Sequence, residues 1–146
     1  MNNIGQYISE TERISSIDDY IIEKLKVNSN SKIIDDHYHP ANKNELRSLI
    51  KELIKQRGNN GDLNDIDTSK ITDMSHLFDN YYLKDFNGNI SEWDVSNVEN
   101  MEYMFNWCYD FKCNLNKWNV KKVKNMKNIF CNCPLEKNPP KWYKDE

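Results

Sequence analysis

The stretch LNDIDTSKITDMSHLF, residues 63–78, decides the fold of this chain, because the sequence repeats it twice more in altered form. The second copy is ISEWDVSNVENMEYMF (residues 90–105), and the third is LNKWNVKKVKNMKNIF (residues 115–130). Equivalent residues lie 27 positions apart in the first step and 25 in the second. A repeat of this length is typical of a solenoid, in which each unit covers its apolar face by stacking on its neighbours.

Seven positions of the repeat carry mostly apolar side chains and predict the core. The columns are Leu63/Ile90/Leu115, Ile66/Trp93/Trp118, Thr68/Val95/Val120, Ile71/Val98/Val123, Met74/Met101/Met126, Leu77/Met104/Ile129 and Phe78/Phe105/Phe130. Within each copy we expect two short elements. The alternation in residues 93–98 predicts a strand, and the spacing of Met101, Met104 and Phe105 predicts one or two helical turns over residues 100–106.

The phrases FNGNISEWDVSNVENMEYMF (residues 86–105) and WNVKKVKNMKNIF (residues 118–130) resemble the BspA-like bacterial surface-protein repeat, a relative of the leucine-rich repeats. Residues 39–78 also resemble the lead-in helix and first repeat of that family, and PLEKNPPKWY (residues 134–143) resembles its usual ending. The resemblance implies a binding or adhesion module, since most members of the family act in that way.

A helix is predicted ahead of the repeats, where Leu46, Leu49, Ile50, Leu53 and Ile54 form one apolar stripe. We expect Asn42 or Asn44 to cap its start and Gly58 to end it. A stack of repeats needs a cover with one polar face at its end, so this helix is the predicted N-terminal cap. Nearer the N-terminus, residues 16–26 predict a second helix and residues 32–35 a short strand.

Pro139-Pro140 predicts the end of the repeats, because proline cannot donate to a ladder of main-chain hydrogen bonds. Trp142 and Tyr143 are expected to fold back over the last copy. The predicted class is therefore α/β, a short leucine-rich-repeat-like solenoid of three strand-plus-short-helix repeats with an N-terminal helical cap. Residues 1–60 form the helical capping region in this prediction, and residues 61–146 form the solenoid with its short C-terminal cap.

The net charge of −3 conceals an uneven distribution. Residues 61–113 carry eleven acidic and three basic residues, which gives −8, whereas residues 114–146 carry eight basic and three acidic residues, which gives +5. Such asymmetry bears on the choice of partners, although solvated faces give the same pattern. The sequence has neither a basic-then-apolar leader nor a long apolar run, so we expect a cytoplasmic protein, or a surface-exposed one if a leader has been removed.

Candidate chemistry in the sequence is sparse. Cys108 and Cys133 are one repeat apart, so we expect them on adjacent rungs as buried thiols, as a disulfide in an oxidising compartment, or as metal ligands. His37 and His39 lie on one side of an extended segment but lack further ligands. None of the four glycines lies in a phosphate-binding loop. We therefore expect no catalytic residues, no bound metal and no cofactor.

Candidate binding residues come from the insertion and from the outward positions of the repeat. The two extra residues of the first copy fall in the loop before Phe86, so Tyr81 and Tyr82 are candidates for recognition, with one of them expected in the core. Five further candidates face outward: Asp94, Ser96, Asn97, Asn119 and Lys121. Asp67, Asp94 and Asn119 recur at one position, which also predicts a turn-capping role.

These observations predict a non-catalytic protein–protein interaction module of unknown partner and oligomeric state. The alternative is a small intracellular inhibitor, encoded by a mobile element or phage, whose acidic surface blocks a nucleic-acid-processing enzyme. The acidic middle of the chain disfavours direct binding of nucleic acid. A third possibility, a fragment of a surface adhesin, needs a leader.

Overall fold

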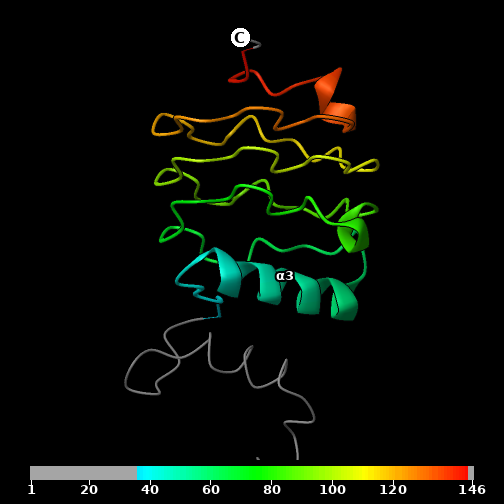
Figure 1. The fold of residues 1–146 in the computed structure, drawn as a ribbon. Helices are drawn as coiled ribbons and strands as arrows, with labels where there is room; N and C mark the ends of the chain where they lie inside the picture. The colour runs from blue at the N-terminus through cyan, green and yellow to red at the C-terminus, as the bar shows by residue number, and fades with distance from the viewer. Residues whose placement is uncertain (1–35, 145–146) are drawn as a thin grey trace, which may run out of the picture.

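The computed structural model describes residues 36–144, in which three copies of the repeat are stacked above a helix (Figure 1). The helix, α3, spans Lys43–Arg57, and two short 3-10 helices, η1 (Tyr81–Leu83) and η2 (Pro134–Glu136), lie in loops. The predicted helix at residues 16–26 and strand at residues 32–35 lie outside the described residues. No helix in the described part of the chain is long and apolar enough to cross a membrane.

Helix α3 forms where the apolar stripe predicts it. The Asn42 side chain accepts a hydrogen bond from the Glu45 main-chain N–H at 3.0 Å, so Asn42 rather than Asn44 is the N-cap. At the other end Gly58 adopts a φ of +81° and donates its N–H to the Ile54 carbonyl at 2.7 Å. Leu46, Leu49, Ile50 and Leu53 are all buried against the first copy of the repeat.

The three copies lie in register, one above another. Parallel bridges join Asp73 to Asn100 and Asn100 to Asn125, and further bridges join Asp62 to Asn89 and Tyr38 to Ile66. The phenylalanine column stacks in the middle, with ring centroids of Phe78 and Phe105 5.3 Å apart and those of Phe105 and Phe130 5.8 Å apart. This stacking supports the predicted class, an α/β leucine-rich-repeat-like solenoid, which stays a prediction together with its division at residue 60.

The elements predicted within each copy are wrong. Residues 93–98 form no strand, because the Val98 N–H turns back to the Val95 carbonyl at 3.0 Å. Residues 100–106 form no helix, because Tyr103 has a left-handed backbone with a φ of +53°. His76 and Asn128, at the same position in the other copies, have φ values of +56° and +53°. Each copy is thus a series of tight turns, and the apolar columns fix which side chains point inward.

Short polar side chains hold these turns. At three positions of every copy an Asp or Asn side chain accepts a hydrogen bond from the main-chain N–H two residues later. The positions are Asp62/Asn89/Asn114, Asp67/Asp94/Asn119 and Asp73/Asn100/Asn125. The predicted turn-capping role of Asp67, Asp94 and Asn119 is therefore confirmed.

The tryptophan side chains also connect successive copies. The indole N–H of Trp93 donates to the Leu63 carbonyl at 2.9 Å, and that of Trp118 donates to the Ile90 carbonyl at 3.1 Å. Trp142 continues the series by donating to the Leu115 carbonyl at 2.7 Å, and its ring lies parallel to that of Trp118. The prediction that Trp142 and Tyr143 fold over the last copy is confirmed, since Tyr143 also contacts the Phe130 ring edge-on.

Candidate functional site

All the large hydrophobic side chains that the described residues expose to solvent belong to two neighbouring loops. Tyr81 and Tyr82 are 77% and 80% exposed, and Trp107 and Tyr109 are each 51% exposed. We call these four residues the aromatic edge. Exposed aromatic side chains are costly to hydrate and are enriched in protein interfaces, so their concentration at one place marks a candidate binding surface.

Tyr81 and Tyr82 lie in the insertion of the first copy, which forms η1 at the right-hand side of the stack (Figure 1). Asn80 starts this 3-10 helix by accepting a hydrogen bond from the Tyr82 N–H at 3.1 Å. A 3-10 helix has three residues per turn, so one residue of three faces inward, and Leu83 takes that place with 2% exposure. The expectation that one tyrosine lies in the core is therefore wrong, and both stay available as recognition candidates.

Trp107 and Tyr109 were not predicted as candidates. Trp107 has a φ of +62°, an unusual conformation for a bulky residue, and its N–H donates to the Cys131 carbonyl at 3.0 Å. The third copy has Asn132 at this position with a φ of +55°, and asparagine tolerates that conformation better. An aromatic residue in place of asparagine is the sequence signal that identifies this site.

The two loops of the aromatic edge lie side by side. The Tyr109 N–H donates to the Lys84 carbonyl at 3.1 Å, which joins the loop of the second copy to that of the first. The Lys84 ammonium lies 5.6 Å from the centre of the Tyr81 ring, within range of a cation–π interaction. The rings also pair within each loop, with centroids 6.1 Å apart for Tyr81 and Tyr82 and 5.9 Å apart for Trp107 and Tyr109.

Among the five candidates predicted on the outward positions, Asn97 joins neighbouring copies and the other four contact each other within a turn of their own copy, so their role in binding stays a prediction. Asp94 accepts hydrogen bonds from the N–H and the hydroxyl of Ser96, and Asn119 accepts one from the Lys121 N–H at 3.2 Å. Asn97 donates to the Ser69 carbonyl at 2.7 Å and accepts from the Lys122 ammonium at 3.0 Å. Asp94, Asn119 and Lys121 are exposed, but no hydrogen bond within residues 36–144 joins any of the five to the aromatic edge.

Part of the acidic middle of the chain pairs with its basic ends. Glu92 and Glu99 lie 2.7 Å and 2.9 Å from the ammonium groups of Lys117 and Lys124, each 25 residues further along the chain. The Lys124 ammonium, which donates a hydrogen bond, holds the pKa of Glu99 below its ordinary value. The charge separation seen in the sequence is therefore reduced where one copy stacks on the next.

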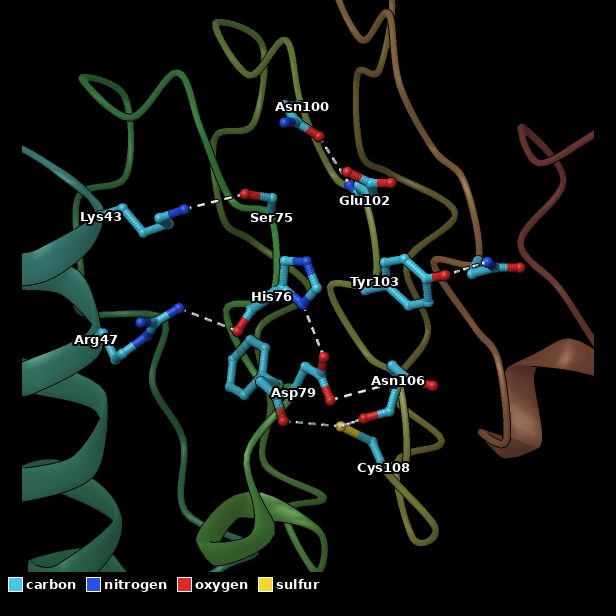
Figure 2. A network of polar contacts seen from close by, with 12 residues as sticks. Lys43, Arg47, Ser75, His76, Asp79, Asn100, Glu102, Tyr103, Asn106 and Cys108 are labelled. Atoms are coloured by element: carbon cyan, nitrogen blue, oxygen red, sulfur yellow. Dashed lines mark hydrogen bonds and ion pairs between the residues drawn. The ribbon is translucent and has the colours of Figure 1, made fainter.

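A polar network connects α3 to the first two copies (Figure 2). Lys43 donates to the Ser75 hydroxyl at 3.0 Å, and Arg47 donates to the His76 carbonyl at 3.2 Å. Beyond them, His76 Nδ1 lies 2.7 Å from Asp79, whose other oxygen accepts a hydrogen bond from the Asn106 amide at 3.2 Å. These contacts position α3 on the stack.

The buried thiols are poor nucleophiles. Burial raises the pKa of the Cys108 thiol far above its ordinary value, and burial raises that of Cys133 to about 11. Both cysteines are free, which agrees with the buried-thiol alternative, and the Cys108 thiol donates to the Phe78 carbonyl at 3.5 Å. The thiolate is the nucleophilic form of cysteine, so a raised pKa lowers the reactivity of both thiols near neutral pH.

The histidine pair of the sequence does not form a metal centre with its described neighbours. His39 Nδ1 lies 3.1 Å from a carboxylate oxygen of Asp67, which anchors this segment to the first copy. Nowhere in residues 36–144 do three or more His, Cys, Asp or Glu side chains gather closely enough to hold a metal ion. The aromatic edge thus stands as the candidate functional site.

Comparisons with known proteins place the chain in a family. Neither the curated proteins nor the solved structures include one that matches this sequence. A family model described as "Mycoplasma protein of unknown function, DUF285" matches residues 45–144, from α3 through the C-terminal cap. Because this match spans more than half of the chain, the protein belongs to that family.

Proposed function

We propose that this chain is a non-catalytic protein–protein interaction module of the BspA-like repeat type, and that the aromatic edge is its binding surface. The observation that carries the proposal is the exposure of Tyr81, Tyr82, Trp107 and Tyr109 on two joined loops. Tyrosine and tryptophan are the residues that contribute most to binding energy at protein interfaces, because they bury a large area with few rotatable bonds.

The backbone of Trp107 adds independent support. Its left-handed conformation costs about 1 to 2 kcal/mol for an ordinary residue, and its indole gains little from burial because it is half exposed. Folding alone favours asparagine at this place, as in Asn132. Strain of this kind is frequent at functional sites.

The alternative function, an inhibitor that blocks a nucleic-acid-processing enzyme through an acidic surface, has less support. Such an inhibitor needs unpaired carboxylates, and four of the eleven acidic residues in 61–113 lie within 3.0 Å of an arginine or lysine nitrogen, which reduces the number available: Asp65, Asp73, Glu92 and Glu99. An aromatic surface and an acidic one also respond differently to salt, which screens charges and leaves apolar contacts intact.

The test is affinity capture of partners from a lysate of the source cells, with the parent chain and three variants. We expect the parent chain to retain a stoichiometric protein at both low and high salt. Tyr81→Ser/Tyr82→Ser should weaken its retention about 30-fold, the effect of losing about 2 kcal/mol of binding energy. Lys51→Ser, on the exposed side of α3, is the matched control and should bind like the parent.

Trp107→Asn separates binding from folding. We expect this substitution to leave the free energy of unfolding within about 1 kcal/mol of the parent value, because relief of backbone strain offsets the lost contacts of the half-exposed ring. The same variant should lose the partner, as measured by capture beside a thermal melt. Equal capture by the parent, Tyr81→Ser/Tyr82→Ser and Trp107→Asn would refute the aromatic edge as the binding surface. Loss of the partner at high salt alone would favour the inhibitor.

A further inference from the structure

Along residues 74–78 and 101–107, the main-chain hydrogen bonds between copies all run in the same direction. In the first copy the N–H groups of Met74, His76 and Phe78 donate to carbonyls of the second copy at 2.8 to 2.9 Å. In the second copy every second N–H from residue 101 to residue 107 donates to the third copy at 2.8 to 3.0 Å. We call this series the turn ladder. Its alternate left-handed residues turn every donor toward the C-terminal end.

The turn ladder therefore ends in a row of free donors. The equivalent N–H groups of the third copy belong to Met126, Asn128, Phe130 and Asn132, and none of them has a partner within residues 36–144. Asn128 and Asn132 have the positive φ values that point successive N–H groups to one side. Rows of this kind form concave sites for anionic or carbonyl oxygen atoms.

The apolar side chains beside this row are incompletely covered. Val95, Val98 and Met101 of the second copy are at most 1% exposed, whereas their equivalents Val120, Val123 and Met126 are only partly buried. The cap formed by Trp142 and Tyr143 contacts the rings of Trp118 and Phe130 but leaves Val120, Val123 and Met126 partly exposed. The C-terminal end thus presents hydrogen-bond donors next to a partly exposed apolar strip.

The charge at this end is positive. Lys121 and Lys127 are exposed and make no ion pair in the described part of the chain. Residues 120–133 contain four lysines and no acidic residue. Free N–H groups and unpaired ammonium groups both favour a negatively charged partner.

A second molecule of this protein does not fit the surface. Two C-terminal ends placed face to face would set donors against donors. The carbonyls equivalent to the acceptors of the ladder belong to Asp73, Ser75 and Leu77 of the first copy, at the opposite end of the stack, where α3 lies and Lys43 donates to the Ser75 hydroxyl (Figures 1 and 2). The occupant must therefore bring acceptors of its own.

We propose that the open end of the turn ladder, from Met126 to Asn132, binds an extended acidic segment of a partner protein. Carbonyl and carboxylate oxygens of the segment accept hydrogen bonds from the free N–H groups. Its acidic side chains also lie near Lys121 and Lys127, and its apolar side chains cover Val120 and Val123. Addition of an extended segment to an open edge is a known mode of peptide recognition. This surface adjoins the aromatic edge, since the Trp107 N–H donates to the Cys131 carbonyl, but it uses none of the four exposed aromatic side chains and does not depend on the function proposed for them.

The test begins with a random-peptide display library selected on the full chain and counter-selected on Lys121→Glu/Lys127→Glu. We expect the retained peptides to be acidic and to alternate acidic with apolar residues. Binding of a synthesised retained peptide should weaken at least about tenfold in Lys121→Glu/Lys127→Glu. Lys51→Glu, at the other end of the stack, and Tyr81→Ser/Tyr82→Ser should bind it like the parent.

Nuclear magnetic resonance of the isotope-labelled chain locates the peptide. We expect it to shift the amide signals of Met126, Asn128, Phe130 and Asn132 and to leave those of Met74 and His76 unchanged. Failure to retain any peptide that depends on Lys121 and Lys127 would overturn the proposal, as would a shift confined to the aromatic edge. Two other results would also overturn it: tighter binding of a single-stranded oligonucleotide at these amides, and a concentration-dependent shift of them without peptide.

Discussion

The two ends of the stack are closed in different ways. At the N-terminal end α3 lies across the first copy, buries four apolar side chains and adds the polar contacts of Lys43 and Arg47. At the C-terminal end Trp142 and Tyr143 cover part of the third copy, and the turn ladder beside them stays open. The difference follows from the direction of the hydrogen bonds in the turn ladder. Because all its N–H groups donate toward the C-terminal end, the ladder itself leaves acceptors unpaired at one end and donors unpaired at the other. Each end needs a different kind of cover.

Breaking the N-terminal cover should have the largest effect. Leu49 is fully buried between α3 and the stack, so Leu49→Asp would place a charge in the core without a partner. We expect the free energy of unfolding to fall by about 4 kcal/mol or more, so that the chain is largely unfolded at room temperature. Thermal and urea unfolding followed by circular dichroism measure this.

Lys51→Asp is the control for this experiment, because Lys51 lies on the exposed side of the same helix and its replacement introduces the same carboxylate, with an even larger change in net charge. Its melting curve should resemble that of the parent. An unchanged melting temperature for Leu49→Asp would show that α3 does not cover the stack.

Breaking the C-terminal cover should cost less. Trp142 is partly buried, stacks on Trp118 and donates to the Leu115 carbonyl, so Trp142→Ala should lower the free energy of unfolding by about 2 to 3 kcal/mol. The loss should be local at first, with faster hydrogen exchange in the third copy than in the first. Uniform acceleration across all three copies would contradict the view that the ends are independent.

Acid should loosen the N-terminal end more than the C-terminal one, where the exposed pair of Glu99 and Lys124 is screened by solvent. Burial alone would raise the pKa of Asp73, but hydrogen bonds from Ser75 and the Lys43 ammonium outweigh it and hold that pKa below its ordinary value. The pKa of Asp67 is lowered in the same way, with Ser69 and His39 opposing the effect of burial. The third copy has Asn119 and Asn125 at these positions, which do not titrate.

The direction in which stability changes with pH follows from the lowered pKa values. The two carboxylates stabilise the fold above their unfolded pKa, and this stability is lost as the pH falls through their folded pKa. Between about pH 7 and about pH 3, hydrogen exchange should therefore rise more in the first copy than in the third, after correction for the intrinsic rate. Asp67→Asn/Asp73→Asn should remove most of this difference. An equal rise in both copies of the parent chain would contradict the assignment.

The repeated columns predicted the buried side chains well. Leu63, Ile90 and Leu115 are buried, as are Phe78 and Phe105, because apolar residues that recur at a fixed interval must face a common core. The covers were predictable for a related reason. The stripe of α3 and the isolated Trp142 had apolar surface that only the ends of the stack could bury.

The backbone within each copy could not be predicted in this way. The spacing of Met101, Met104 and Phe105 fits a helical turn and also fits the observed turns, and only the positive φ of Tyr103 distinguishes them. The aromatic edge was found in part, through the insertion that carries Tyr81 and Tyr82. Trp107 was not predicted because it lies outside the seven apolar columns of the repeat. Comparison with Asn132 would have shown that position to be an outward turn.

Amide hydrogen exchange of the isotope-labelled chain tests most directly whether the turn ladder has one closed and one open end. The amides of Met74, His76 and Phe78 should exchange slowly, because each donates to the second copy. The amides of Met126 and Asn128 should exchange near the rate of an unprotected peptide, and Trp142→Ala should leave them unchanged. Equal protection of Met74 and Met126 in the parent chain would contradict the directional ladder and remove the basis for an open C-terminal end.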